Sequence, residues 1–376
     1  MDVKFSANQI HGGRVFEAAH LLGRPWTEII DFSANINPLG QPRGLKEAIF
    51  EDFERSLHYP EVKAESLTQR LAEETGLSAA HFLPGAGSTP HLHLLPRALE
   101  LSRPVIVGPA FAEYEAALHR AGRRVSYVST RERDHWLVTR ETLDRVFKKE
   151  PDAIFLANPA NPTGRLVPGD LLVNLAAECR RRETWLVVDE AFIDFTDNGR
   201  SLLNLVEKNQ RLIVLRSLTK IYALPGLRLA FLAAHPKVMS RLTHLVEPWT
   251  LSSPAICAGH YCLSRSGFKE NTLKGVRIFR RHLMKELAAL ELGQLYPSEC
   301  NFILMSLKDG FSPQALLKHL FQDGILVRDA SNFHGLKPGF LRLAVRPVEE
   351  VAALTKSLKR FLERESRPSA PTNPEV

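Results

Sequence analysis

The chain has 376 residues, a length that accommodates two or three domains. Hydrophobic residues make up 44% and charged residues 24%, which excludes a chain that is disordered throughout. Lys and Arg number 49 and Asp and Glu 42, so the net charge is +7 at pH 7. Glutamates flank the longest basic run, 180–182, a pattern typical of a solvated helix face, so we expect no nucleic-acid binding.

The cysteines, histidines and apolar runs exclude further classes of protein. No CxxC pair or metal-ligand spacing occurs, and His91 and His93 are too close in sequence to share a helix face, so no metal site is predicted. Residues 1–13 lack the apolar segment of a secretory signal, and no apolar run approaches the ~18 residues of a membrane span. We expect a cytoplasmic protein with no membrane segment and with reduced thiols at Cys179, Cys257, Cys262 and Cys300.

The first two thirds of the chain predict a parallel sheet. A glycine-rich segment, 85–90, predicts the start of a helix with Ser88 as its N-cap. Nearly continuous apolar runs follow, and helical patterns such as 170–182 separate them, which indicates strands that helices cover on both faces. The predicted strands are 104–109, 153–159, 185–192, 211–218 and 227–234.

The last third of the chain predicts a smaller α+β unit. Residues 274–292 and 349–364 have helical patterns, and 301–307 and 340–346 have strand patterns. The predicted fold class is α/β, with a large domain around a mostly parallel sheet and a smaller α+β domain. The predicted divisions are an N-terminal arm with part of the small domain (1–48), the large domain (49–250), the C-terminal small domain (251–363) and a flexible tail (364–376).

Polar residues follow three of the predicted strands. Asn158–Gly164, Asp189 with Glu190, and Arg216–Lys220 come directly after apolar runs. Because ligands of open α/β sheets bind at the carboxyl ends of the strands, an amide, a carboxylate and an amine are expected in one crevice. Taken singly, each is more often a turn, a helix cap or a surface lysine, so the prediction depends on their occurring together.

The combination suits pyridoxal phosphate. A lysine in a partly apolar site can form a Schiff base, and a carboxylate can pair with a protonated ring nitrogen. The helix start near Gly87 and Ser88 offers amide donors to the cofactor phosphate, and Arg228 can close on the same anion.

Three segments, 157–164, 187–192 and 217–231, resemble the signature of fold-type I pyridoxal-phosphate enzymes of the aminotransferase class. The resemblance extends from about His11 to about Leu362. It implies that Lys220 bonds the cofactor, that Asp189 pairs with the ring nitrogen, and that Asn161 bonds the ring 3-oxygen. It also implies a homodimer with shared active sites. The remaining implied cofactor contacts are Gly87, Ser88, Ser217 and Arg228 at the phosphate, Phe111 on the ring, and Tyr59 at the phosphate of the neighbouring subunit.

Two groups within the family resemble this chain. Segments 11–23, 29–42, 189–195 and 341–346 are similar to the decarboxylases that convert L-threonine O-3-phosphate to aminopropanol phosphate in cobalamin biosynthesis. The other group is the histidinol-phosphate aminotransferases, which usually have Tyr where Phe192 stands and lack a basic residue at Arg346. A third hypothesis is that the chain is a binding module without enzymatic activity. The implied contacts for an anionic amino-acid phosphate are His11, Asn35, Arg328, Arg342 and Arg346.

Overall fold

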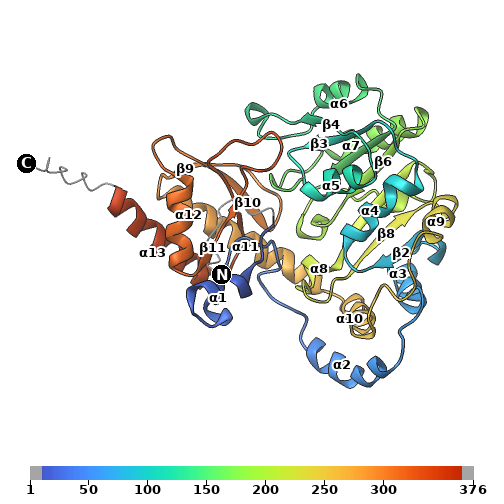
Figure 1. The fold of residues 1–376 in the computed structure, drawn as a ribbon, viewed down its shortest axis with the longest axis horizontal. Coiled ribbons are helices and arrows are strands. Elements are labelled where there is room, and N and C mark those ends of the chain that lie inside the picture. Colours follow the sequence, from blue (N-terminus) through green and yellow to red (C-terminus); the bar gives the residue numbers. More distant parts are fainter. Residues whose placement is uncertain (1–10, 366–376) are drawn as a thin grey trace, which may run out of the picture.

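The computed structural model describes residues 11–365, and a seven-stranded sheet forms its larger part (Figure 1). The strand order is β2-β8-β7-β6-β5-β3-β4, and β8 alone runs antiparallel to its neighbours. The predicted α/β class with a mostly parallel sheet is therefore confirmed. The strands of this sheet are β2 (Phe82–Gly85), β3 (Pro104–Gly108), β4 (Ser126–Ser129), β5 (Ala153–Ala157), β6 (Trp185–Asp189), β7 (Leu212–Ser217) and β8 (Ala230–Ala234).

Alternate residues of each central strand enter different hydrophobic cores. In β6, Leu186 and Val188 belong to one core and Val187 to the other. Successive side chains of a strand point to opposite faces, so a strand that is covered on both sides must be apolar at every position. This explains why the strands appeared in the sequence as continuous apolar runs.

Helices cover both faces of the sheet. Apolar residues of α4 (Ser88–Ala98), α5 (Ala112–Arg120) and α9 (Pro236–Thr243) contribute to one core. Residues of α3 (Glu65–Thr75), α6 (Arg140–Phe147), α7 (Gly169–Arg181) and α10 (Ser253–Leu263) contribute to the other, together with the smaller unit. The remaining helices are α1 (Val15–Leu22), α2 (Leu45–Glu51), α8 (Leu218–Ile221), α11 (Phe268–Ala288), α12 (Pro313–Gln322) and α13 (Val348–Glu365).

The smaller unit combines the two ends of the described chain. The antiparallel sheet β12-β13-β10-β9 packs with the last helices, and α1 lies close to α12 (Figure 1). A parallel pair joins β1 to β11, about 300 residues later, and Ile30 pairs there with Ile325. The strands of this unit are β1 (Ile30–Asp31), β9 (Gly293–Leu295), β10 (Phe302–Leu307), β11 (Ile325–Leu326), β12 (Arg328–Asp329) and β13 (Phe340–Ala344).

The contacts of two helices bear on how the units divide. Helix α10 packs on α2 and α3, beside the large sheet, whereas α11 packs on α13 and β9. Residue 251, the predicted start of the C-terminal domain, thus precedes a helix whose neighbours belong to the large unit. The predicted domain boundaries stay a prediction, and the predicted tail beyond residue 365 lies outside the described residues. Between residues 11 and 365, no helix has the length and apolar character needed to cross a membrane.

Candidate active site

A cavity of about 590 Å³ lies where the carboxyl ends of the large sheet meet the smaller unit. This size is typical of cofactor and small-molecule sites. Twelve residues of the predicted site line the cavity, which therefore collects side chains from widely separated segments. They are His11, Asn35, Gly87, Ser88, Phe111, Asn161, Asp189, Ser217, Lys220, Arg228, Arg328 and Arg342.

Lys220 lies in α8, the short helix that directly follows β7. Its side chain is buried in the cavity, and this burial, together with the charges of Arg228 and Arg342, lowers the pKa of the amine to about 8. Desolvation and nearby positive charge both disfavour the protonated amine. A substantial fraction of Lys220 is thus neutral and nucleophilic near physiological pH.

Asp189 ends β6, one strand away from Lys220 in the sheet. The Tyr114 hydroxyl donates to its carboxylate at 2.7 Å, and the backbone N–H of Ala191 donates at 2.9 Å. Burial raises the pKa of Asp189 despite these bonds. A buried carboxylate in this position is stabilised by a positively charged ligand group, such as a protonated ring nitrogen.

The start of α4 forms the anion-binding end of the cavity. Gly87, at a φ of 89°, is the N-cap, so the prediction that Ser88 caps the helix was wrong by one residue. A Cβ at Gly87 would lie 2.5 Å from the guanidinium of Arg228, so a larger residue would strain the backbone at this positive φ and displace the arginine. Ser217 and the helix amides complete a set of donors that suits a phosphate.

His91 packs against Gly85 at this end of the cavity. The ring is buried, and it packs so closely beneath Gly85 that a Cβ there would lie 2.6 Å from Nε2. Burial lowers the pKa of His91 from 6.5 to about 4. The histidine is therefore a neutral residue that packs within the fold.

The depressed pKa of His91 predicts a pH-dependent stability. Between pH 6.5 and 4 the unfolded chain binds a proton at this residue and the folded chain does not, so the free energy of unfolding falls as the pH falls. The expected loss across this window is about 3 kcal/mol. Urea unfolding at a series of pH values measures it, and His91→Gln, which cannot titrate, should flatten the dependence. Parallel curves for the two proteins would contradict the prediction.

Arg342 connects the cavity to the N-terminal part of the smaller unit. It donates to Asn161 Oδ1 at 2.6 Å and to the carbonyl oxygen of Ser33 at 2.6 Å. Because Asn161 accepts through its oxygen, its amide group remains available as a donor to a ligand. Burial, with the charge of Arg328, lowers the pKa of Arg342 to about 9.

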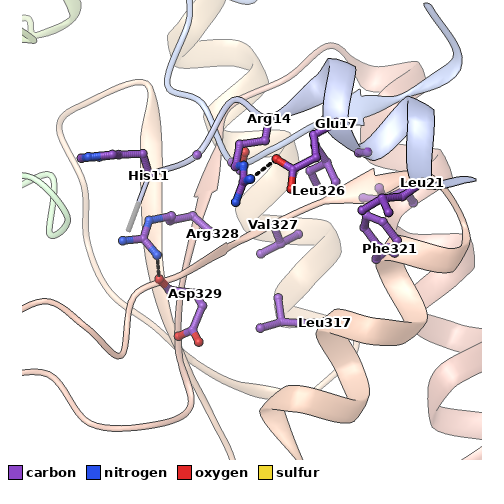
Figure 2. A pocket seen from close by; sticks show the side chains of 14 residues that line it. His11, Arg14, Glu17, Leu21, Leu317, Phe321, Leu326, Val327, Arg328 and Asp329 are labelled. Carbon is purple, nitrogen blue, oxygen red and sulfur yellow. Dashed lines mark hydrogen bonds and ion pairs between the residues drawn. The ribbon is translucent and has the colours of Figure 1, made fainter. Parts of the chain in front are cut away.

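Arg328 stands beside Arg342, and their Cα atoms pair across β12 and β13. Its guanidinium donates to Asn332 at 2.7 Å and to the backbone of Asp329, and burial lowers its pKa to about 10. Arg328 and His11 also line a neighbouring cavity under α1, in which their side chains extend to the same side (Figure 2). Two adjacent buried arginines repel each other, so an anionic ligand is expected to stabilise them.

Two predicted residues do not reach this cavity. Arg346 binds Glu350 through two hydrogen bonds, of 2.7 and 2.9 Å, in the arrangement of an ordinary i,i+4 ion pair. Tyr59 stacks on Trp249 with 4.7 Å between ring centroids and is 82% exposed. Arg346 thus pairs with Glu350 and does not line the cavity in this chain, and Tyr59 is exposed to contact with another molecule.

Several lining residues escaped the sequence analysis. Tyr114, Glu113 and Phe333 are the clearest examples. Tyr114 and Glu113 follow the predicted Phe111 within three residues. This proximity in sequence was the only signal that could have indicated them. Phe333 lies in the loop between β12 and β13, which carries no recognisable motif.

The residues present fit pyridoxal phosphate. An amine of low pKa, a buried carboxylate and an anion-binding helix start surround one cavity of suitable size. The buried side chain of Asn35 and the Nε of Arg342 have no hydrogen-bond partner in the described part of the chain. Unpartnered buried polar groups are costly, so a polar ligand in the cavity would stabilise them.

Comparisons with known proteins agree with this fit. The family described as aminotransferase class I and II matches residues 27–358. Threonine-phosphate decarboxylase from Salmonella typhimurium is 34% identical to this chain, over 94% of this chain and 97% of the relative. Histidinol-phosphate aminotransferase from Thermoanaerobacter pseudethanolicus is 31% identical, over 81% and 84%. The structure of histidinol-phosphate aminotransferase from Sinorhizobium meliloti in complex with pyridoxal-5'-phosphate has a similar fold, with a TM-score of 0.83 and 21% identity over 96% of both chains.

Proposed function

Because the chain belongs to the class I and II aminotransferase family, whose members use pyridoxal phosphate, we propose that it decarboxylates L-threonine O-3-phosphate. The products are carbon dioxide and (R)-1-amino-2-propanol O-2-phosphate, and the proposed role is in cobalamin biosynthesis. The single observation that carries the proposal is the pair of buried arginines, Arg328 and Arg342, beside the nucleophilic Lys220. Two guanidinium groups suit a substrate with two anionic groups, a carboxylate and a phosphate.

Bound pyridoxal phosphate supplies an electron sink that makes one bond at the substrate Cα labile. The residues of this chain decide which bond that is. Arg328 and Arg342 would hold the two anions and would thereby fix the orientation of the substrate, which decides the bond that is presented for cleavage. Asp189 stabilises positive charge at the ring nitrogen, and Tyr114 orients that carboxylate through its hydrogen bond. Lys220, with its pKa of about 8, returns a proton to Cα after carbon dioxide leaves.

Phe192 supports decarboxylation over amino transfer. Its ring is buried against the cavity and packs on Phe302, so no hydroxyl stands at this position to bond the cofactor 3-oxygen. The second candidate is a histidinol-phosphate aminotransferase. The 31% identity to such an enzyme favours it.

Purified protein loaded with pyridoxal phosphate distinguishes the two candidates. Incubation with L-threonine O-3-phosphate is expected to release carbon dioxide and to form one aminopropanol phosphate for each carbon dioxide. In parallel, histidinol phosphate and 2-oxoglutarate test for amino transfer. Amino transfer without release of carbon dioxide from threonine phosphate would reject the decarboxylase and support the aminotransferase.

The proposed enzyme is a homodimer with shared active sites. The support is a group of exposed apolar residues on one side of the large unit, near α2 and the Tyr59–Trp249 pair. A patch of this kind is typical of an interaction surface, and Tyr59 within it could reach the cofactor phosphate of a second copy. The exposed residues are Phe50 at 71%, Phe53 at 58%, Leu57 at 80%, Tyr59 at 82% and Trp249 at 47%.

A cytoplasmic location also stays a prediction.

A further inference from the structure

One carboxylate at the cavity, that of Glu113, has no part in the chemistry above. It lies in the first turn of α5, and its side chain is only 15% exposed. Asp189 is the only other carboxylate among the described lining residues. A carboxylate that faces an anionic substrate opposes binding unless a cation neutralises it, so the partner of Glu113 matters.

The partner is His11. Nε2 of His11 lies 3.2 Å from Oε1 of Glu113. Nε2 of His93 lies 3.5 Å from the other carboxylate oxygen, but Arg120 approaches that same nitrogen at 2.9 Å. Because arginine can only donate, His93 must accept there and cannot donate to Glu113 through this nitrogen. Of the two histidines, His11 thus makes the closer ion-pair contact with Glu113.

The segment that carries His11 also contacts Ser33. The backbone N–H of Gly13 donates to Ser33 Oγ at 2.8 Å. A Cβ at Gly12 would lie 2.2 Å from the carbonyl oxygen of Ser33, the same oxygen that accepts from Arg342. Residues 11–13 therefore lie tightly against the smaller unit, and the His11–Glu113 contact connects them to the large unit.

His11 and Arg328 line the same cavities. Both line the cofactor cavity, and their side chains extend to the same side in Figure 2. The imidazole also packs near Phe111, with 5.9 Å between ring centroids. Its position thus depends on the ion-pair contact with Glu113 and on packing against Phe111.

We infer that Glu113 is a positioning residue that holds His11 at the cavity mouth, where the imidazole and Arg328 together receive one anionic group of the substrate. This inference rests on the proposed function, because it requires an anionic substrate. Without Glu113, His11 would adopt other rotamers and the segment 11–13 would loosen. The substrate would then bind less tightly, whereas the bond-breaking step at Lys220 would be unaffected.

Kinetics of the loaded enzyme test the inference. Glu113→Gln and Glu113→Ala are expected to raise KM for threonine phosphate about fivefold and to leave kcat within about twofold, as for the loss of a partly exposed ion pair. The matched control is Glu115→Gln on the same helix, because Glu115 bonds Tyr127 and does not line the cavity. The control should keep the KM of the unmodified enzyme.

A double variant shows whether Glu113 acts through His11. If it does, His11→Ala with Glu113→Ala should have the KM of His11→Ala alone, whereas independent roles would multiply the two effects. Multiplied effects would overturn the inference.

Amide hydrogen exchange gives a readout that does not depend on activity. The Gly13 amide is expected to exchange several-fold faster in Glu113→Ala than in the unmodified enzyme or in Glu115→Gln. Unchanged exchange together with an unchanged KM would overturn the positioning role. Failure of the unmodified enzyme to release carbon dioxide would instead reject the proposed function, and Gly13 exchange would still decide whether Glu113 holds the segment.

Discussion

Replacing Lys220 by alanine is expected to abolish product formation and the covalent attachment of pyridoxal phosphate. The amine is the only lysine nitrogen that lines the cavity in the described chain, and its pKa of about 8 makes it reactive near neutral pH. Loss of a proton-transferring group alone typically costs ~10²–10⁴-fold in rate, and loss of the covalent attachment adds to this. Release of carbon dioxide and reduction with borohydride followed by mass measurement of the chain test the two effects.

Lys237→Ala is the matched control, because Lys237 is exposed on α9, away from the cavity. This variant should retain the rate and the attached cofactor. If Lys220→Ala kept the borohydride-stable cofactor adduct, the assignment of Lys220 would be wrong. If it lost the adduct but kept the full rate, the proposed chemistry would be wrong instead.

The pKa of Lys220 also predicts how cofactor attachment depends on pH. The neutral amine is the reactive form, so the rate at which apoprotein takes up pyridoxal phosphate should rise with pH and level off above pH 8. An ordinary lysine, with a pKa of 10.5, would show a rate still rising tenfold per unit at that point. Stopped-flow absorbance across this range distinguishes the two.

Replacing Arg216 by methionine is expected to destabilise the fold by about 3–5 kcal/mol, the usual cost of removing one partner of a buried ion pair. Arg216 lies near the end of β7, and its guanidinium is 2.7 Å from Asp194 and 3.4 Å from Glu190. Burial alone would raise the pKa of Asp194, but the charges of Arg216 and Lys269 outweigh it and lower that pKa. Without Arg216, the two carboxylates would be buried with too little positive charge.

Urea unfolding followed by circular dichroism measures this effect. Arg180→Met is the control, because Arg180 is exposed and such a change usually costs less than ~0.5 kcal/mol. Adding Asp194→Asn to Arg216→Met removes one of the uncompensated charges and should restore part of the stability. Equal losses for the Arg216 and Arg180 variants would show that the buried network does not stabilise the fold.

Much of the large unit was predictable because burial on both faces leaves a continuous apolar run. The strands β3, β5, β6, β7 and β8 all lie within predicted runs. The short strands β2 and β4 were missed, since each has only four residues. The antiparallel direction of β8 was not predicted either, because a strand that is apolar throughout looks the same in either direction.

The sequence likewise indicated the positions of some residues of the candidate site and not of others. Asn161, Asp189 and Lys220 were predictable, because polar residues stood out directly after apolar runs, and parallel strands end at one edge of a sheet. The position of Arg346 was not predictable, since its sequence context looked like that of Arg342, yet its side chain pairs with Glu350 and does not line the cavity. Residues only four apart on β13 and beyond can therefore have different roles, and the local pattern does not distinguish them.

The amino-acid sequence by itself determined the layered α/β fold and the groups able to hold pyridoxal phosphate, because both depend on local order along the chain. Only the tertiary structure decided the partners of those groups. Tyr114 bonds Asp189 from 75 residues away, and Arg342 bonds Asn161 from 181 residues away. His11 likewise meets Glu113 across the two units of the protein. Such contacts depend on how helices and sheets pack and on the rotamers that packing permits, and neither is expressed in the spacing of residues along the chain.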